Sequence, residues 1–362
     1  MKLLPPISDP VFHQQSYSTL NKFFLWFIKD ERDLPFIYLL IKMSVVLPPL
    51  ALLLYMPFIN GWLWWTIVII FFVATFMFRT PFGLMIHCVS HRQFFKNRNK
   101  KLIYYITWFL GPFLGLTPET YFSHHIGMHH VENNMPDDDS STMFYERDSL
   151  KDFIKYVADF IFTGMAGLIF YLTKNNRKKL ARRAFTGEMY FFAICIALCF
   201  LNWQATIVVF IFTFFVSRII MMVGNWTQHA FIDPQHPDDF YRNSITCINV
   251  RYNRIAWNDG YHISHHLKPT LHWTEHPESF LANFDKYAAN KAIVFDGLDF
   301  GGVFFNLMRK RYDVLASHFV NINEVYKNDD EVIALLKNRT QRFTPGSIPA
   351  QHTMLNELQL LS

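Results

Sequence analysis

Histidine is the residue type in this chain whose number and spacing could do chemistry. There are sixteen histidines, and most lie in short clusters. The clusters read His87-Cys-Val-Ser-His91, His125-Ile-Gly-Met-His129-His130 and His262-Ile-Ser-His265-His266, and His229 ends the run Asn225-Trp-Thr-Gln-His229. Residues three or four apart share one face of an α-helix, so each cluster can aim imidazoles at one point. Imidazole suits iron, and nine such ligands predict a site for two metal ions.

Two simpler interpretations explain less of this pattern. A single histidine is usually a solvated or capping residue, but that does not account for three spaced clusters. A catalytic zinc ion takes only three protein ligands, so nine would be a large excess. One ambiguity stays open, because His124 precedes the second cluster and either His124 or His125 could be its first ligand. The spacing favours His125.

The composition indicates a membrane protein. Hydrophobic residues make up 51% of the chain and charged residues 17%, against about 25% charged in a soluble domain. The formal net charge is +5, which in such a chain is typical of basic residues flanking membrane spans. No sequence of a nucleic-acid-binding fold is visible, so nucleic acid is not an expected partner. The four cysteines form no C-x-x-C pair, which excludes a zinc ribbon and a disulfide framework.

Apolar runs predict four membrane spans in two hairpins. The first hairpin comprises residues 36–58 and 62–79, and the second comprises 187–203 and 205–223. The apolar stretch 102–116 is shorter than the roughly 20 residues that a span needs, so it is predicted to be re-entrant or interfacial. Residues 1–35 lack a signal peptide and are predicted to be a cytoplasmic segment with a short amphipathic helix near residues 21–29.

Charge predicts the orientation of these spans. The basic stretches 83–101 and 174–183 are expected on the cytoplasmic side by the positive-inside rule. Both lie inside only if residues 153–172 rest on the membrane surface as an amphipathic helix. The prediction is an all-α polytopic membrane protein with four transmembrane helices in two hairpins and a cytoplasmic histidine-rich cap. Its catalytic domain is predicted to span residues 36–285, followed by a cytoplasmic helical region at 286–362.

The three motifs H-x3-H, H-x3-H-H and H-x2-H-H, in this order, resemble the histidine boxes of the membrane fatty-acid desaturase and hydroxylase superfamily. The resemblance covers about residues 60–285. Asn225 and His229 are similar to an additional ligand pair of stearoyl-CoA desaturases, in which the asparagine contacts the metal through a water. The resemblance implies a di-iron cap with two iron ions and these ligands: His87, His91, His125, His129, His130, His229, His262, His265 and His266.

Other residues near the boxes are expected to support the ligands. His124, Glu132 and Asp259 are candidates to orient imidazoles, although a capped loop explains Glu132 equally well. The run Asp137-Asp138-Asp139 is predicted to be a solvated acidic loop. The third box begins with histidine rather than the glutamine of front-end desaturases. No fused cytochrome b5 segment is visible, which implies an external electron donor of the cytochrome b5 or ferredoxin type.

The resemblance implies an oxygen-dependent enzyme that introduces a double bond into a lipid acyl chain. A lipid or carotenoid hydroxylase or ketolase would use the same ligands, so the boxes do not separate these activities. A membrane transporter with structural histidines is a third possibility, but it would place ionisable residues within the spans, and here Lys42 and Arg218 lie near the span ends. The expected location is the endoplasmic reticulum in a eukaryote or the inner membrane in a bacterium.

Overall fold

The computed structural model describes residues 1–14 and 16–344, which are mostly helical. The chain folds into two compact units. The hairpin unit comprises Phe12–Gly127 and Ile169–Ile220, and the C-terminal unit comprises Met1–Val11, Met128–Leu168 and the chain from Met221 onward. The predicted all-α membrane fold is confirmed. Within the described residues, four helical runs are long and apolar enough to cross a membrane: Glu31–Tyr55, Gly61–His91, Leu150–Lys174 and Lys178–Gln228.

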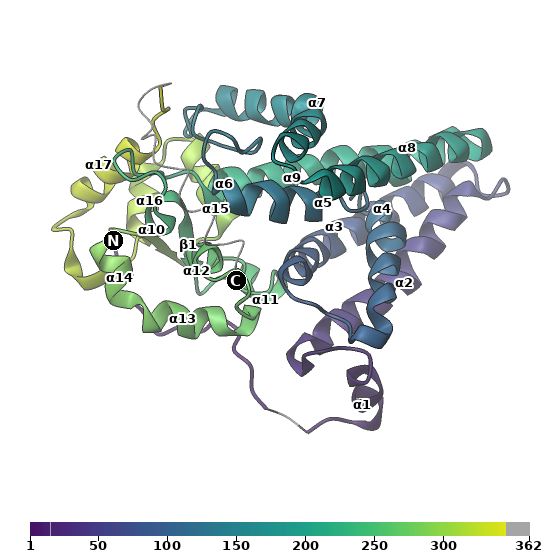
Figure 1. Ribbon diagram of the computed structural model, residues 1–362, viewed down its shortest axis with the longest axis horizontal. Helices are drawn as coiled ribbons and strands as arrows, with labels where there is room; N and C mark the ends of the chain where they lie inside the picture. Colours follow the sequence, from purple (N-terminus) through teal and green to yellow (C-terminus); the bar gives the residue numbers. More distant parts are fainter. Residues whose placement is uncertain (15, 345–362) are drawn as a thin grey trace. The chain divides into compact units, whose positions relative to one another are not determined.

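The first hairpin of the hairpin unit consists of α2 (Leu34–Tyr55) and α3 (Gly61–His91), which lie side by side (Figure 1). At 1.5 Å per residue, α2 is about 33 Å long and α3 about 46 Å. The hydrocarbon core of a bilayer is about 30 Å thick. Helix α3 is therefore long enough to carry its last turns, with His87 and His91, out of the hydrocarbon. Large apolar side chains such as Ile69 and Phe76 are exposed along α3, as expected where lipid is the solvent.

The run Lys178–Gln228 reverses direction in its middle. It contains α8 (Lys178–Thr206), the π-helix η5 (Ile207–Ile211) and α9 (Phe212–Gln228), and Asn202 has non-helical backbone angles. The Asn202 side chain accepts a hydrogen bond from the Ala205 backbone N–H, which caps the helix that follows. The rings of Phe191 and Phe214 stack with centroids 5.5 Å apart. The two segments are therefore antiparallel, and the break at Asn202 lies close to residue 204, which separates the two predicted spans.

A close backbone approach joins α8 to the segment that carries the second histidine box. A Cβ at Gly187 would lie 1.6 Å from the carbonyl oxygen of Pro118, so only glycine fits there. The neighbouring Glu188 is buried and forms an ion pair of 2.8 Å with Arg218, and it accepts a hydrogen bond from Thr120. Thr120 begins α5 (Thr120–His124). These contacts fix the start of the box on the second hairpin.

Short helices occupy the rest of the hairpin unit. Helix α1 (Thr19–Leu25) overlaps the stretch 21–29 where an amphipathic helix was predicted, and a 3-10 helix η1 (Glu31–Asp33) precedes α2. The stretch predicted to be re-entrant or interfacial contains no long helix. Its elements are η2 (Asn97–Leu102), the π-helix η3 (Tyr105–Leu110) and α4 (Gly111–Phe113).

Helix α7 (Leu150–Lys174) is longer than the segment 153–172 predicted to lie on the surface. By length and composition it is a candidate span, so its position at the surface stays a prediction. Within the C-terminal unit, Phe153 and Tyr156 of α7 pack against Met222 and Trp226.

The C-terminal unit contains two short strands that the all-α prediction omitted. Strands β1 (Ile245–Ile248) and β2 (Ile293–Asp296) pair in parallel, with Ile245 opposite Ile293. Lys2 forms a parallel bridge with Val320, so the first residues belong to this unit. The predicted domain boundary at residue 285 falls inside α14. The surrounding helices are α10 (Phe240–Asn243), α11 (Arg251–Ile255), α12 (His262–Leu267), η6 (Trp273–Glu275), α13 (His276–Ala282), α14 (Phe284–Ala289), α15 (Phe300–Met308), α16 (Tyr312–His318), η7 (Ile322–Glu324) and α17 (Asp329–Arg339).

Gly260 connects β1 to the helix that carries the third histidine box. Its carbonyl accepts a hydrogen bond of 2.7 Å from the Cys247 N–H, and its own N–H donates to Asn253 Oδ1 at 3.0 Å. A Cβ at Gly260 would lie 2.3 Å from Asn253 Oδ1 and 2.5 Å from the Cys247 carbonyl oxygen. We expect Gly260→Ala to lower the free energy of unfolding by about 1–3 kcal/mol, as overpacking does. Thermal unfolding in detergent measures this, with Gly224→Ala, which has open space around its Cα, as the control.

Candidate metal centre

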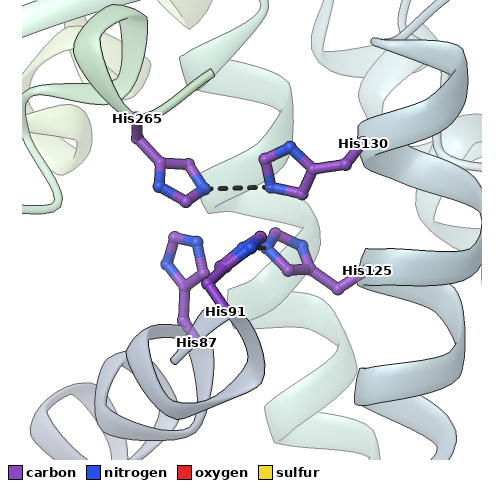
Figure 2. A group of neighbouring side chains, drawn as sticks. All are labelled: His87, His91, His125, His130 and His265. Atoms are coloured by element: carbon purple, nitrogen blue, oxygen red, sulfur yellow. Dashed lines mark hydrogen bonds between the residues drawn. The ribbon is translucent and has the colours of Figure 1, made fainter. Parts of the chain in front are cut away.

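The first histidine box lies at the end of α3 in the hairpin unit. His87 and His91 are one helical turn apart, and their rings lie near that of His125 from the second box. The ring centroids of His87 and His125 are 4.5 Å apart, and the Nε2 atoms of His91 and His125 are 2.9 Å apart. Figure 2 shows these three imidazoles pointing toward one another. Their candidate ligand atoms lie within 4.8 Å of each other.

The second box lies on a helical segment with a π-helical turn. The segment runs from α5 through η4 (His125–His129) to α6 (His130–Glu132). In a π-helix the hydrogen bonds run from residue i to i+5. Although His125 and His129 are four residues apart, His125 lies with His87 and His91, whereas His129 belongs to a group in the C-terminal unit. His124 is in neither group.

Four histidines of the C-terminal unit form the second group. His129 comes from η4, His229 follows α9, and His262 and His266 lie one turn apart on α12. All four are buried, and their candidate ligand atoms lie within 4.8 Å of one another. His262 Nε2 is 3.3 Å from His229 Nε2 and 3.0 Å from His266 Nε2. We name this set the four-histidine group.

The hydrogen bonds of this group aim lone pairs at its centre. His129 Nδ1 lies 2.7 Å from Asp138 Oδ2, and His229 Nδ1 lies 3.0 Å from the Asn243 carbonyl oxygen and 2.8 Å from its Oδ1. A carboxylate and a carbonyl only accept, so both Nδ1 atoms carry the proton. Nε2 is then the unprotonated atom that can bind a metal. Burial lowers the pKa of His229 to about 4, which keeps that ring neutral at physiological pH. Converging imidazoles of this kind fit iron.

The two remaining predicted ligands also lie together. In the C-terminal unit, His130 Nε2 and His265 Nε2 are 3.0 Å apart, and Figure 2 marks this contact by a dashed line. His265 is on α12, between the two members that this helix gives to the four-histidine group. Helix α12 thus gives His262 and His266 to the four-histidine group and places His265 next to His130.

Asp138 is not part of a solvated loop, and for this residue the prediction was wrong. Its side chain is 3% exposed and bonds His129, and its other oxygen accepts hydrogen bonds from the N–H and Oγ of Ser140 at 2.8 and 2.7 Å. A buried carboxylate behind a ligand histidine fixes the ring orientation and raises its basicity. Asn243 does the same for His229 through neutral oxygens, and sequence analysis missed it because no motif surrounds it.

Asn225 is held by its amide nitrogen. Nδ2 donates to the Ser140 carbonyl and to the Tyr156 hydroxyl, both at 2.8 Å. A carbonyl cannot donate, so the atom facing Ser140 must be the NH₂ group. Oδ1 is then the atom through which Asn225 would accept a hydrogen bond from a metal-bound water.

The two acidic residues predicted to orient imidazoles have different surroundings. Asp259 is buried, and its Oδ2 accepts hydrogen bonds from Gln228 Nε2 at 3.1 Å and from the Tyr252 hydroxyl at 2.7 Å. Gln228 directly precedes His229, so Asp259 supports the backbone next to a predicted ligand. Glu132 is half-buried at the end of α6, where its carbonyl accepts from the Met135 N–H.

The N-terminal residues support the third box. Asp9 is buried, and its Oδ2 accepts hydrogen bonds of 2.7 Å from the Tyr261 hydroxyl and from the Asn249 N–H. The Pro10 carbonyl accepts from Asn258 Nδ2 at 2.7 Å. Tyr261 directly precedes His262. We name residues 1–11 the N-terminal strap, and its role was missed because the partners are more than 200 positions apart in the chain.

We expect Asp138→Asn to weaken metal binding about 10- to 100-fold, the usual effect of losing a carboxylate behind a ligand histidine. Asparagine keeps the size of the side chain but removes the charge that holds the His129 Nδ1 proton. Metal content after dialysis against graded chelator measures the change. Asp137→Asn is the matched control, because Asp137 is exposed. Equal metal retention in both variants would contradict the role of Asp138.

The fold and the histidine groups define an integral membrane protein whose histidines can hold metal ions. A family model described as Fatty acid desaturase matches residues 62–296, which is more than half of the chain. The chain therefore belongs to the fatty acid desaturase family, and the resemblance read from the histidine boxes is confirmed. Comparisons with curated proteins and with solved structures gave no match.

Proposed function

We propose that the protein is an oxygen-dependent desaturase that introduces a double bond into a lipid acyl chain with the help of two iron ions. The observation that carries this proposal is the four-histidine group, whose buried imidazoles converge, with the Nε2 atoms of three of them in contact, in a chain of the fatty acid desaturase family. Iron ions at such a site would supply, with dioxygen, the oxidising power that breaking unactivated C–H bonds requires.

The proposed ligands divide into two sets. The four-histidine group would hold one iron ion. The other five predicted ligands are His87, His91 and His125 in the hairpin unit and His130 and His265 in the C-terminal unit.

The chain's own residues prepare the ligands. Asp138 and Asn243 hold the protons of His129 and His229 on Nδ1, which leaves Nε2 for the metal. The burial of all four rings keeps bulk water away, which strengthens electrostatic interactions in the site. Asn225 is proposed to contact one metal ion through a water.

The Asn225 and His229 pair supports desaturation over the runner-up, a lipid or carotenoid hydroxylase or ketolase. Desaturation takes two hydrogens from neighbouring methylenes of the acyl chain. Together with two protons and two electrons from an external donor, they reduce dioxygen to two waters. A donor of the cytochrome b5 or ferredoxin type is proposed.

The predicted orientation also remains a proposal, with the histidine clusters on the cytoplasmic side. The contacts of α7 support its position at the surface. In the C-terminal unit, Asp139 lies against Gly167, and the Tyr145 hydroxyl donates to Asp159 at 2.8 Å. A polar loop thus lies along much of α7. Because exposed polar backbone is not found in the hydrocarbon of a bilayer, these contacts support a surface position for α7.

Expression in a host with few fatty-acid species tests the proposed function. We expect mass spectrometry to find an acyl chain two hydrogens lighter, absent from cells that express His265→Ala. A product heavier by one oxygen would instead support the hydroxylase. Purified protein that binds far less iron than about two ions per chain, despite iron supply, would contradict the di-iron proposal.

A further inference from the structure

An apolar groove that no histidine lines lies in the hairpin unit. Its volume is about 330 Å³, and its walls come from α1 and Phe27, from α2, and from residues between Phe95 and Ile106. Ligand pockets in proteins range from about 300 to 1,000 Å³, so this groove has room for a slender ligand. Ile41 and Val45 of α2 line it and are 40% and 65% exposed. The groove is therefore open along a helix that is a candidate membrane span.

The walls offer an occupant almost no polar contact. Ten of the twelve lining residues are phenylalanine, leucine, isoleucine or valine, and the other two are Ser44 and Tyr105. The Tyr105 hydroxyl donates to Ser44 Oγ at 2.7 Å, and Ser44 Oγ donates to the Leu40 carbonyl at 2.7 Å. Both hydroxyl groups thus donate their hydrogen bonds within the protein. The chemistry of the groove suits an alkyl chain.

The chain segments that supply two walls of this groove are basic. Residues 12–29 and 93–118, which form two of its walls, contain no aspartate or glutamate. They contain six basic residues, which are Lys22, Lys29, Lys96, Arg98, Lys100 and Lys101. Lys100 and Lys101 are exposed and directly precede Leu102, a lining residue. The charge of these walls favours an anionic group at the end of the alkyl chain.

Helix α1 has the features of a segment that lies in a membrane interface. Phe23 and Trp26 are 58% and 51% exposed, and Lys22 is exposed beside them. The Arg98 guanidinium lies over the Trp26 ring, 3.6 Å from its centroid, and donates to the Trp26 carbonyl. Aromatic residues next to lysine and arginine are typical of the headgroup region.

We propose that this groove binds an anionic phospholipid of the surrounding bilayer. One acyl chain lies between α1 and α2, and the phosphate lies on Lys100 and Lys101. The bilayer supplies this ligand laterally through the open side of the groove. The inference depends on the membrane location and the groove, and it is independent of the reaction proposed above.

Lipid retention tests the proposal. The full-length protein is placed in nanodiscs of equimolar phosphatidylglycerol and phosphatidylcholine, extracted into mild detergent, and its bound lipids are counted by mass spectrometry. We expect the wild type to retain phosphatidylglycerol preferentially. In the double variant Lys100→Glu/Lys101→Glu the preference should fall on the order of tenfold or more, because each basic residue near an anionic surface contributes substantially.

Two control variants separate the groove from general effects. Lys178→Glu/Lys179→Glu makes the same charge change at exposed lysines of the same unit, and it should keep the preference. Ile41→Trp should fill the groove and lower the retention of both lipids, whereas Ile69→Trp on the lipid-facing side of α3 should not. The lysine variants are at the surface, so they remain informative if Ile41→Trp does not fold.

Three outcomes would overturn the proposal. The wild type could retain both phospholipids equally, or the two double lysine variants could lose the preference equally. In a third outcome, palmitoyl-coenzyme A at a concentration equal to that of the protein displaces the retained phosphatidylglycerol, which would assign the groove to a soluble acyl thioester.

Discussion

Replacing His262 with alanine is expected to abolish product formation and to remove the metal ion of the four-histidine group. His262 is the central member of that group, because its Nε2 lies close to both His229 Nε2 and His266 Nε2. Its side chain is 2% exposed, so water cannot readily take the place of the lost ligand. The imidazoles that remain would bind a metal more weakly.

Iron analysis and product analysis on the same preparation measure this effect. We expect the iron content to fall from about two ions per chain to about one or fewer, and the product to fall to the level of a host without the protein. His236→Ala is the matched control, because His236 is an exposed histidine of the same unit. Normal iron and product in the His262 variant would show that the group is structural.

Replacing Arg147 with methionine is expected to lower the free energy of unfolding by about 3–5 kcal/mol. Arg147 is fully buried, and its guanidinium donates only to backbone carbonyls in the described structure. Those carbonyls belong to the loop after Asp138, to Ala230, to Arg339 at the end of α17 and to Gln341 just after it. Methionine fills much of the volume but leaves the carbonyls without a donor, and each unsatisfied group costs about 1–3 kcal/mol.

The midpoint of thermal unfolding in detergent should fall on the order of 10 °C for this variant. Burial lowers the pKa of Arg147 to about 9, so the guanidinium is charged at neutral pH and the loss should not depend on pH between 6 and about 8. Arg147→Lys should have an intermediate effect, since it keeps the charge but has fewer donors. Arg251→Met, at an exposed arginine of the same unit, should change little. An unchanged midpoint for Arg147→Met would contradict this account.

The histidines were predictable because metal ligands repeat at short helical spacings. The choice of His125 over His124 followed from spacing alone, and the structure groups His125 with His87 and His91. The separation of His125 from His129 was not predictable, because residues four apart on a helix are expected to share a face. The hydrogen-bond partners of the ligands were harder still. Asp138, Asn243 and Asp9 reach the boxes through the tertiary fold, and no local pattern marks a buried aspartate within an acidic run.

The fold was predictable to a similar degree. Long apolar runs indicated α2 and α3, and the division between the predicted spans 187–203 and 205–223 falls within two residues of the break at Asn202. Strands β1 and β2 were not foreseen. Each has only four residues, and they pair across more than forty intervening positions. Helix α7 was ambiguous because its apolar character satisfies the requirements for a span as well as for a surface helix.

The N-terminal strap has a consequence for the order of events during synthesis. Its residues are synthesised long before their partners, because Asp9 bonds Tyr261 and Lys2 pairs with Val320. The third histidine box therefore gains its full support only after the chain has been translated past residue 320. A ribosome that stalls before residue 320 would leave a membrane-inserted chain with its spans made and its strap undocked. Such a chain would offer unpaired strand edges and loosely held histidines to proteases and to stray metal ions.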